Sequence, residues 1–302
     1  MLPALAAAFD EPLGNSSALA IYLVSKLASE QVKVVLTGEG GDELFGGYHT
    51  YLADVLAPRI GSAARILRPL VDALPASERR GSIVYAAKRF VCFAHLPPLE
   101  RHCGWKEILS SDARAELLRP ELGAYDPLGL ARARFAETAG SEELARLQDI
   151  DLGGYLVDDL LLKTDRASMA HSLEARVPYL DEAVASLALA LPTRLKVKVW
   201  AKKRLLRRAV APLLPRSVVF ARKRGFSIPA AAWLRGPLLP FARDALSAES
   251  IRRQGLLEPE AVSRLLDAHV VGREDLSRPL WGLLMFTLWY DQASAQSIAE
   301  AA

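Results

Sequence analysis

Apolar and polar positions along the chain follow two kinds of pattern. Residues 32–36 read Val-Lys-Val-Val-Leu, a β-branched run that predicts a buried strand of a parallel sheet. Just before it, Leu19, Leu23 and Leu27 recur at helical spacing, and Asn15 stands where it can cap that helix. The amino-terminal part is therefore predicted to be a helix that leads directly into a strand.

Most of the remaining chain has helical periodicity. Apolar residues recur at helical spacing through residues 52–140, and Ser110 or Ser111 followed by Asp112 can start a helix there. Residues 279–290 are apolar all round but too few to cross a bilayer, so they predict a buried core helix. The pattern predicts an α/β protein that is predominantly helical.

The composition changes this picture little. The 302 residues are 51% hydrophobic and 24% charged, as in soluble globular proteins. A net charge of +3 is too small to imply nucleic acid. Cys92 and Cys103 lack metal-ligand spacing, and neither a signal peptide nor a membrane-length apolar run is present. We expect a reduced, cytoplasmic protein without a membrane partner.

Candidate chemistry begins where the predicted strand ends. Residues 37–48 read Thr-Gly-Glu-Gly-Gly-Asp-Glu-Leu-Phe-Gly-Gly-Tyr, which threads carboxylates among glycines. A glycine-rich turn after a parallel strand is where α/β sheets bind ligands, and its backbone N–H groups suit phosphate. Carboxylates would repel that anion unless a hard cation lay between them. The turn therefore indicates a nucleotide with Mg²⁺, although a plain tight connection is the alternative reading.

A second polar region lies at residues 155–181. On a helix, Asp159 and Lys163 form an i,i+4 pair that shares a face with Arg166, while Leu160 and Ala167 can face a core. Such charges usually form a solvated face. Ionisable residues just before Pro178 can instead point into a cleft.

Four ordered motifs carry a family resemblance. They are residues 37–48, Asp-Arg-Ala-Ser-Met-Ala followed by Leu-Glu-Ala-Arg-Val-Pro-Tyr-Leu-Asp within 165–181, Lys-Arg-Leu-Leu-Arg at 203–207, and Lys-Arg-Gly-Phe-Ser-Ile-Pro at 223–229. Together they resemble the synthetase domain of glutamine-dependent asparagine synthetases. The resemblance implies an adenine-nucleotide-hydrolase-like (ATP-pyrophosphatase) fold, with a parallel sheet followed by a helical lobe. It divides the chain into a nucleotide-site α/β part at about 1–60, a helical segment at about 61–140, and a lobe at about 141–302 that completes the site.

The resemblance also implies a reaction. The aspartate side-chain carboxylate attacks MgATP, giving β-aspartyl-AMP, and ammonia derived from glutamine then displaces AMP. In this reading Glu39 is the general base for the amide-forming step. Lys203 and Arg166 stabilise phosphate charge, and Glu174 stands beside the acyl-adenylate.

The remaining site residues bind the nucleotide and the metal. The resemblance places the nucleotide-binding group at Thr37, Gly38, Gly40, Gly41 and Lys223. Asp42 is the expected ligand of Mg²⁺.

Two departures from the family pattern stand out. The sequence has no Ser-Gly-Gly-x-Asp-Ser loop to grip pyrophosphate, and Leu2 replaces the cysteine of an amino-terminal glutaminase domain. A fragment is the favoured explanation. A second chain that supplies the missing half, or loss of catalysis, are the alternatives. We expect the chain alone to be inactive.

Other functions stay open at this point. An amidotransferase acting on another carboxylate, or a non-catalytic subunit, fits the same motifs. A tRNA-modifying ATP-pyrophosphatase would explain the basic residues of 194–208, but no RNA-binding module is visible, so nucleic acid is not the expected partner. A homodimer is compatible with the sequence.

Overall fold

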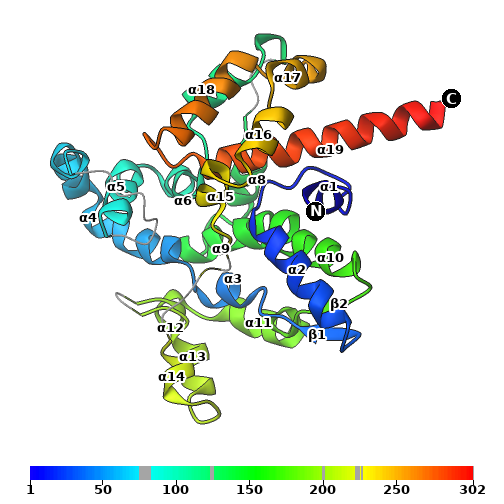
Figure 1. Ribbon diagram of the computed structural model, residues 1–302. Coiled ribbons are helices and arrows are strands. Elements are labelled where there is room, and N and C mark those ends of the chain that lie inside the picture. Colours follow the sequence, from blue (N-terminus) through cyan, green and yellow to red (C-terminus); the bar gives the residue numbers. More distant parts are fainter. Residues whose placement is uncertain (75–82, 123–125, 199–200, 222–224, 226, 302) are drawn as a thin grey trace.

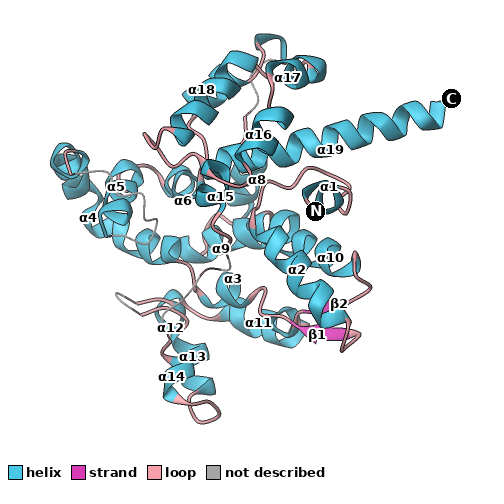
Figure 2. Ribbon diagram, viewed as in Figure 1, coloured by secondary structure: helices cyan, strands magenta, loops and turns pink. Residues whose placement is uncertain are grey.

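The computed structural model describes residues 1–301 except 75–82, 123–125, 199–200, 222–224 and 226. It confirms the predominantly helical α/β class, since most elements are helices and the two described strands form one small parallel sheet at the edge of the molecule (Figures 1 and 2). Within the described residues, no helix is long and apolar enough to cross a membrane. Cys92 and Cys103 are both free thiols.

The sheet joins two segments far apart in the sequence. Strand β1 (Val34–Leu36) runs parallel to β2 (Glu174–Arg176), with Val35 opposite Ala175. The prediction that β1 is buried was wrong: Val34 is 39% and Leu36 72% exposed. Side chains alternate between the two faces of a strand, and no described element covers the face that carries these two residues.

Two helices pack together beside the strands. They are α2 (Ser17–Ser29) and α10 (Leu162–Met169), and α10 also contacts β2. Asn15 is not the cap residue of α2, because the helix begins one residue later than that role requires. Its side-chain oxygen still accepts a hydrogen bond from the Ser17 backbone N–H at 3.1 Å. Leu23 and Leu27 of α2 are 40% and 67% exposed, so only part of the predicted apolar face is buried.

The middle of the chain is helical, as predicted. After the short α3 (Gly41–Phe45), its elements are α4 (His49–Asp72), α5 (Ile83–Phe93), α6 (Pro98–Lys106), α7 (Ser111–Leu117), the 3₁₀ turn η1 (Pro120–Leu122), α8 (Gly129–Glu137) and α9 (Glu143–Gly153). The Ser110 side chain caps α7 by accepting from the Ala113 N–H. A π-helical segment, η2 (Tyr155–Leu161), joins α9 to α10.

The carboxy-terminal part begins after β2. Its elements are η3 (Pro178–Leu180), α11 (Glu182–Ala190), α12 (Thr193–Lys196), α13 (Arg204–Val210), α14 (Arg216–Val219), α15 (Ala230–Arg235), α16 (Leu239–Ala245), α17 (Ala248–Gln254), α18 (Pro259–Val270) and α19 (Ser277–Ala301). Asp181 caps α11 by accepting from the Ala183 and Val184 N–H groups.

The largest apolar core joins the two ends of the chain. The amino-terminal helix α1 (Leu2–Ala6) packs against α19, and the distal half of α19 projects from the body (Figure 1). Leu5, Leu280 and Leu284 are fully buried and Trp281 is 1% exposed. The predicted buried core helix at 279–290 is thereby confirmed, and it fixes α19 beside the elements that carry the site.

Candidate active site

A cavity of about 770 Å³ lies at the carboxyl end of β1. Thr37, Gly38, Glu39, Asp42 and Glu43 of the glycine-rich turn form one wall. Residues of α2, η2 and α10 form the others. The motif 37–48 therefore borders a cavity, as expected for ligand binding at the end of a parallel strand.

Glycine is required at two points of this turn. Gly40 has φ of +83°, and a Cβ there would lie 2.3 Å from a Leu180 side-chain carbon. The turn then enters α3, whose first turn carries Asp42 and Glu43. Gly46 has φ of +69° and ends α3. Neither Gly40 nor Gly41 lines the cavity, so both act through the backbone path.

The structure brings Lys203 to Asp42. The Lys203 Nζ lies 2.9 Å from Asp42 Oδ1, although the two residues belong to different motifs. Lys203 adopts φ of +52°, a left-handed conformation that is uncommon for a residue other than glycine. Such conformations persist where the surroundings fix them, often at functional sites.

Glu39 is held by a residue that sequence reasoning missed. The Thr164 hydroxyl donates to Glu39 Oε1 at 2.9 Å, and Thr164 also lines the cavity. Nothing in the sequence pattern singled out Thr164, since a lone threonine within a helix carries no chemical signal.

Asp159 and Lys163 lie beside this contact. Their predicted i,i+4 pair is confirmed, with Lys163 Nζ 3.8 Å from Asp159 Oδ1. The Asn15 amide donates to both Asp159 oxygens at 2.8 and 3.0 Å. Burial raises the pKa of Asp159 and lowers the pKa of Lys163, each opposed by the attraction of its partner. The pair is thus not the solvated face that such charges usually form.

Two predicted residues lie outside the cavity lining, and a third is not described. Arg166 pairs with Asp10, and neither side chain lines the cavity. Glu174 pairs with Arg176 at 2.7 Å on the exposed part of β2, outside the cavity lining. Lys223 lies outside the described residues.

Buried polar contacts stabilise the glycine-rich turn and α3. Glu43 is 1% exposed and accepts a hydrogen bond from the Tyr48 hydroxyl, while burial raises its pKa. The Gln148 side chain of α9 donates to the Glu43 and Leu44 carbonyl oxygens. Lys196 Nζ in turn donates to Gln148 Oε1 at 2.9 Å. This chain of contacts ties α3 to α9 and α12.

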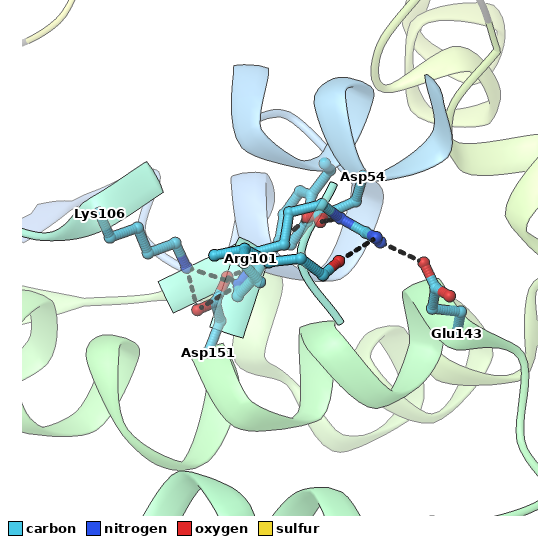
Figure 3. A network of polar contacts seen from close by, with 8 residues as sticks. Asp54, Arg101, Lys106, Glu143 and Asp151 are labelled. Carbon is cyan, nitrogen blue, oxygen red and sulfur yellow. Dashed lines mark hydrogen bonds and ion pairs between the residues drawn. The ribbon is translucent and has the colours of Figure 1, made fainter. Parts of the chain in front are cut away.

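A second polar network, shown in Figure 3, lies between α4, α6 and α9. The His102 imidazole is fully buried, 2.6 Å from Asp54 and 3.2 Å from Asp151. Arg101 pairs with Asp54 at 3.2 Å, and Lys106 pairs with Asp151. The network borders a separate cavity of about 930 Å³ that shares Tyr155 and Arg278 with the first. The glycine-rich turn does not line that larger cavity, so we place the candidate chemistry in the smaller one.

The residues present fit a nucleotide with Mg²⁺ only in part. Among the described residues, the buried Thr37 Oγ1 has no hydrogen-bond partner, so it offers a polar atom to a ligand. A Cβ at Gly38 would meet nothing within 4 Å, so this position leaves room for the ligand. Among the described residues, no group of three or more His, Cys, Asp or Glu side chains is placed to hold a metal. Asp42 alone suits Mg²⁺, which commonly binds through one or two carboxylates together with substrate phosphates.

A parallel strand that ends in a glycine-rich turn beside a pocket defines an α/β protein of the ligand-binding class. Comparison with known sequences then gives the family: the Asparagine synthase family model matches residues 1–291, and the chain belongs to that family. This confirms the resemblance drawn from the four motifs.

Individual relatives agree with this assignment. The chain is 32% identical over 295 residues to Asparagine synthetase [glutamine-hydrolyzing] 1 of Bacillus subtilis, covering 96% of this chain and 45% of that protein. It is 25% identical over 282 residues to Amidase chry2 of Gibberella zeae, covering 85% of this chain and 41% of that protein. The chain thus spans less than half the length of these curated relatives.

Proposed function

We propose that this chain carries the synthetase part of an ATP-dependent asparagine synthesis. In this reaction the side-chain carboxylate of aspartate attacks the α-phosphorus of ATP, forming β-aspartyl-AMP and releasing pyrophosphate. Ammonia derived from glutamine then attacks the acyl carbon, and AMP leaves. The observation that carries the proposal is that Glu39 and Asp42 line one cavity and that Lys203 reaches Asp42.

The chain's own residues have distinct tasks in this proposal. Glu39, oriented by Thr164, takes a proton from the attacking nitrogen as the amide forms. Lys203 places a positive charge beside the phosphates, where negative charge moves as pyrophosphate departs. Asp42 would hold Mg²⁺, which neutralises phosphate charge when bound. Thr37 and Gly38 border the nucleotide, with Gly40 and Gly41 shaping the turn around it.

Arg166, Glu174 and Lys223 keep their proposed roles at the nucleotide phosphates, the acyl-adenylate and the nucleotide. For Arg166 and Glu174 this requires that their exposed pairs with Asp10 and Arg176 open. Exposed ion pairs contribute little free energy, so opening them costs little.

The proposal includes a partner for the chain. A glutaminase domain or chain would supply the ammonia. The division of the chain into a nucleotide-site part at about 1–60, a helical segment at about 61–140 and a lobe at about 141–302 remains part of the same proposal.

The substitution equivalent to Glu39→Gln in a full-length relative tests the role of Glu39. We expect asparagine formation to stop while aspartate-dependent pyrophosphate release continues, because glutamine keeps the shape but cannot accept the proton. Both products are measured in one assay, by pyrophosphate release and by amino-acid analysis. Unchanged asparagine output would refute the role of Glu39.

A further inference from the structure

Lys163 has an unusual position for a lysine. Its side chain is 5% exposed, and the residue lines the cavity that holds Glu39 and Asp42. Lysine is rarely buried unless it is paired, because desolvation of an ammonium group is costly. The only ion pair of Lys163 among the described residues is with Asp159, at 3.8 Å.

That pair leaves the ammonium group largely unused. Asp159 already accepts two hydrogen bonds from the Asn15 amide, at 2.8 and 3.0 Å. An ammonium group has three donors, and within the described part of the chain no hydrogen bond to Lys163 Nζ is formed. The donors therefore face the cavity without a hydrogen-bond partner among the described residues, and the Glu39 and Glu43 carboxylates also attract the ammonium group. This arrangement suits an anion-binding group.

The local backbone supports a functional reading. Lys163 is the second residue of α10, which follows η2, a π-helix; π-helical turns are rare, and those that occur are often at functional sites. The wider turn places Tyr155 and Leu160 on the same cavity wall as Lys163 and Thr164. The segment thus contributes several side chains to the cavity lining.

Lys163 lies on the Glu39 side of the cavity. Thr164, the next residue, holds Glu39, whereas Lys203 holds Asp42 at the proposed metal and phosphate position. In the proposed reaction Glu39 acts where the new amide bond forms. An anion bound by Lys163, beside Glu39, therefore belongs to the acceptor substrate and not to the nucleotide.

We propose that Lys163, held in place by Asp159 and Asn15, binds a carboxylate of the acceptor substrate. The inference rests on the proposed function and deepens it by assigning the acceptor subsite. It makes the acceptor a molecule with a second carboxylate besides the one that is activated, such as a dicarboxylic amino acid. Arg278, which borders the same cavity, adds positive charge on that side.

Binding measurements on the whole chain test this assignment. Isothermal titration would give the Kd of L-aspartate, of succinate and of β-alanine in the presence of ATP, and the Kd of ATP alone. We expect Lys163→Met to weaken L-aspartate and succinate at least tenfold, because each loses a charged hydrogen bond. The Kd of ATP should stay within twofold, and β-alanine, which has one carboxylate, should bind weakly to the wild-type protein.

The matched control is Lys26→Met, which removes an exposed lysine of α2 that does not line the cavity. It should leave every Kd unchanged. If Lys163→Met does not fold, the inference is tested on the wild-type protein instead. L-Aspartate should protect Lys163, but not Lys26, from acetylation by acetic anhydride, as measured by mass spectrometry.

A failure of this inference and a failure of the proposed function would give different results. Unchanged aspartate affinity in Lys163→Met, or no protection of Lys163, would overturn the inference and leave the proposed function standing. An equal loss of ATP affinity would also overturn it, because the bound anion would then be a phosphate. A wild-type protein that binds neither ATP nor aspartate would overturn both.

Discussion

At the scale of single residues, the contact between Asp42 and Lys203 depends on a glycine. A Cβ at Gly47 would lie 1.7 Å from Asp42 Oδ1 and 2.4 Å from Lys203 Cε. Any larger residue must therefore push the Asp42 carboxylate out of its position. The sequence motif contains Gly47, but only the folded chain explains why it is needed there.

We predict that Gly47→Ala weakens Mg²⁺-dependent ATP binding about tenfold, because the displaced carboxylate no longer faces the phosphate position. Stability should change by less than about 1 kcal/mol, since a flexible side chain can move aside. Titration of ATP with and without Mg²⁺, and thermal unfolding, measure the two effects. Gly129→Ala is the control, because its Cβ would meet only Asp126, at 3.7 Å. Equal ATP affinity in both variants would contradict the role of Gly47.

Lys203→Ala, introduced at the equivalent position of a full-length relative, should depress aspartate-dependent pyrophosphate release. The alanine cannot supply the positive charge that offsets the developing charge on pyrophosphate. The rate is followed by a coupled pyrophosphate assay at saturating ATP. A normal adenylation rate would remove Lys203 from the site.

At the scale of elements, His102 links three helices through two carboxylates. Burial and the Lys106 cation lower its pKa, but the hydrogen bonds to Asp151 and Asp54 outweigh them and raise the pKa above its ordinary value of 6.5. The folded protein therefore binds this proton more tightly than the unfolded chain. The stability that follows is fully present below about pH 6.5 and is lost as pH rises through the folded-state pKa.

We predict that His102→Gln lowers the free energy of unfolding by about 3 kcal/mol near pH 6, because two buried carboxylates each lose one of their charged partners. It should also abolish the wild-type loss of stability above about pH 6.5. Urea unfolding at several pH values measures both. The exposed His95→Gln should behave as wild type. A wild-type protein whose stability does not fall with rising pH would contradict this account.

The η2 segment shows why element type was only partly predictable. The sequence predicted one helix face with Asp159, Lys163 and Arg166, and the Asp159–Lys163 pair is present. Arg166 instead turns to Asp10, and residues 155–161 adopt the π form. Local spacing cannot distinguish an α-turn from a π-turn. The choice depends on how the segment packs against α9 and α10, the helices on either side of it in the chain.

At the scale of the whole molecule, one face of β1 is not covered by any described element. Val34 and Leu36 are exposed although the strand has a buried-strand composition. The sequence also contains no Ser-Gly-Gly-x-Asp-Ser loop. Among the described residues, the proposed site rests on Glu39, Asp42 and Lys203.

We predict that residues 1–302 alone release little or no pyrophosphate from ATP with aspartate, since no segment of this sequence matches the expected pyrophosphate-binding loop. An AMP-formation assay with purified chain measures this, and a full-length relative under the same conditions is the positive control. Aspartate-dependent AMP formation by the chain alone would show that the loop is dispensable.

The sequence by itself determined the helical α/β class, the glycine-rich turn after β1, the family and the core helix within α19, because each depends on local composition or spacing. Tertiary structure alone decided which side chains meet. Lys203 reaches Asp42, Thr164 reaches Glu39 and Asn15 reaches Asp159. It also left Glu174 on an exposed strand. Contacts between residues more than a hundred positions apart depend on how helices pack, and periodicity carries no information about that packing.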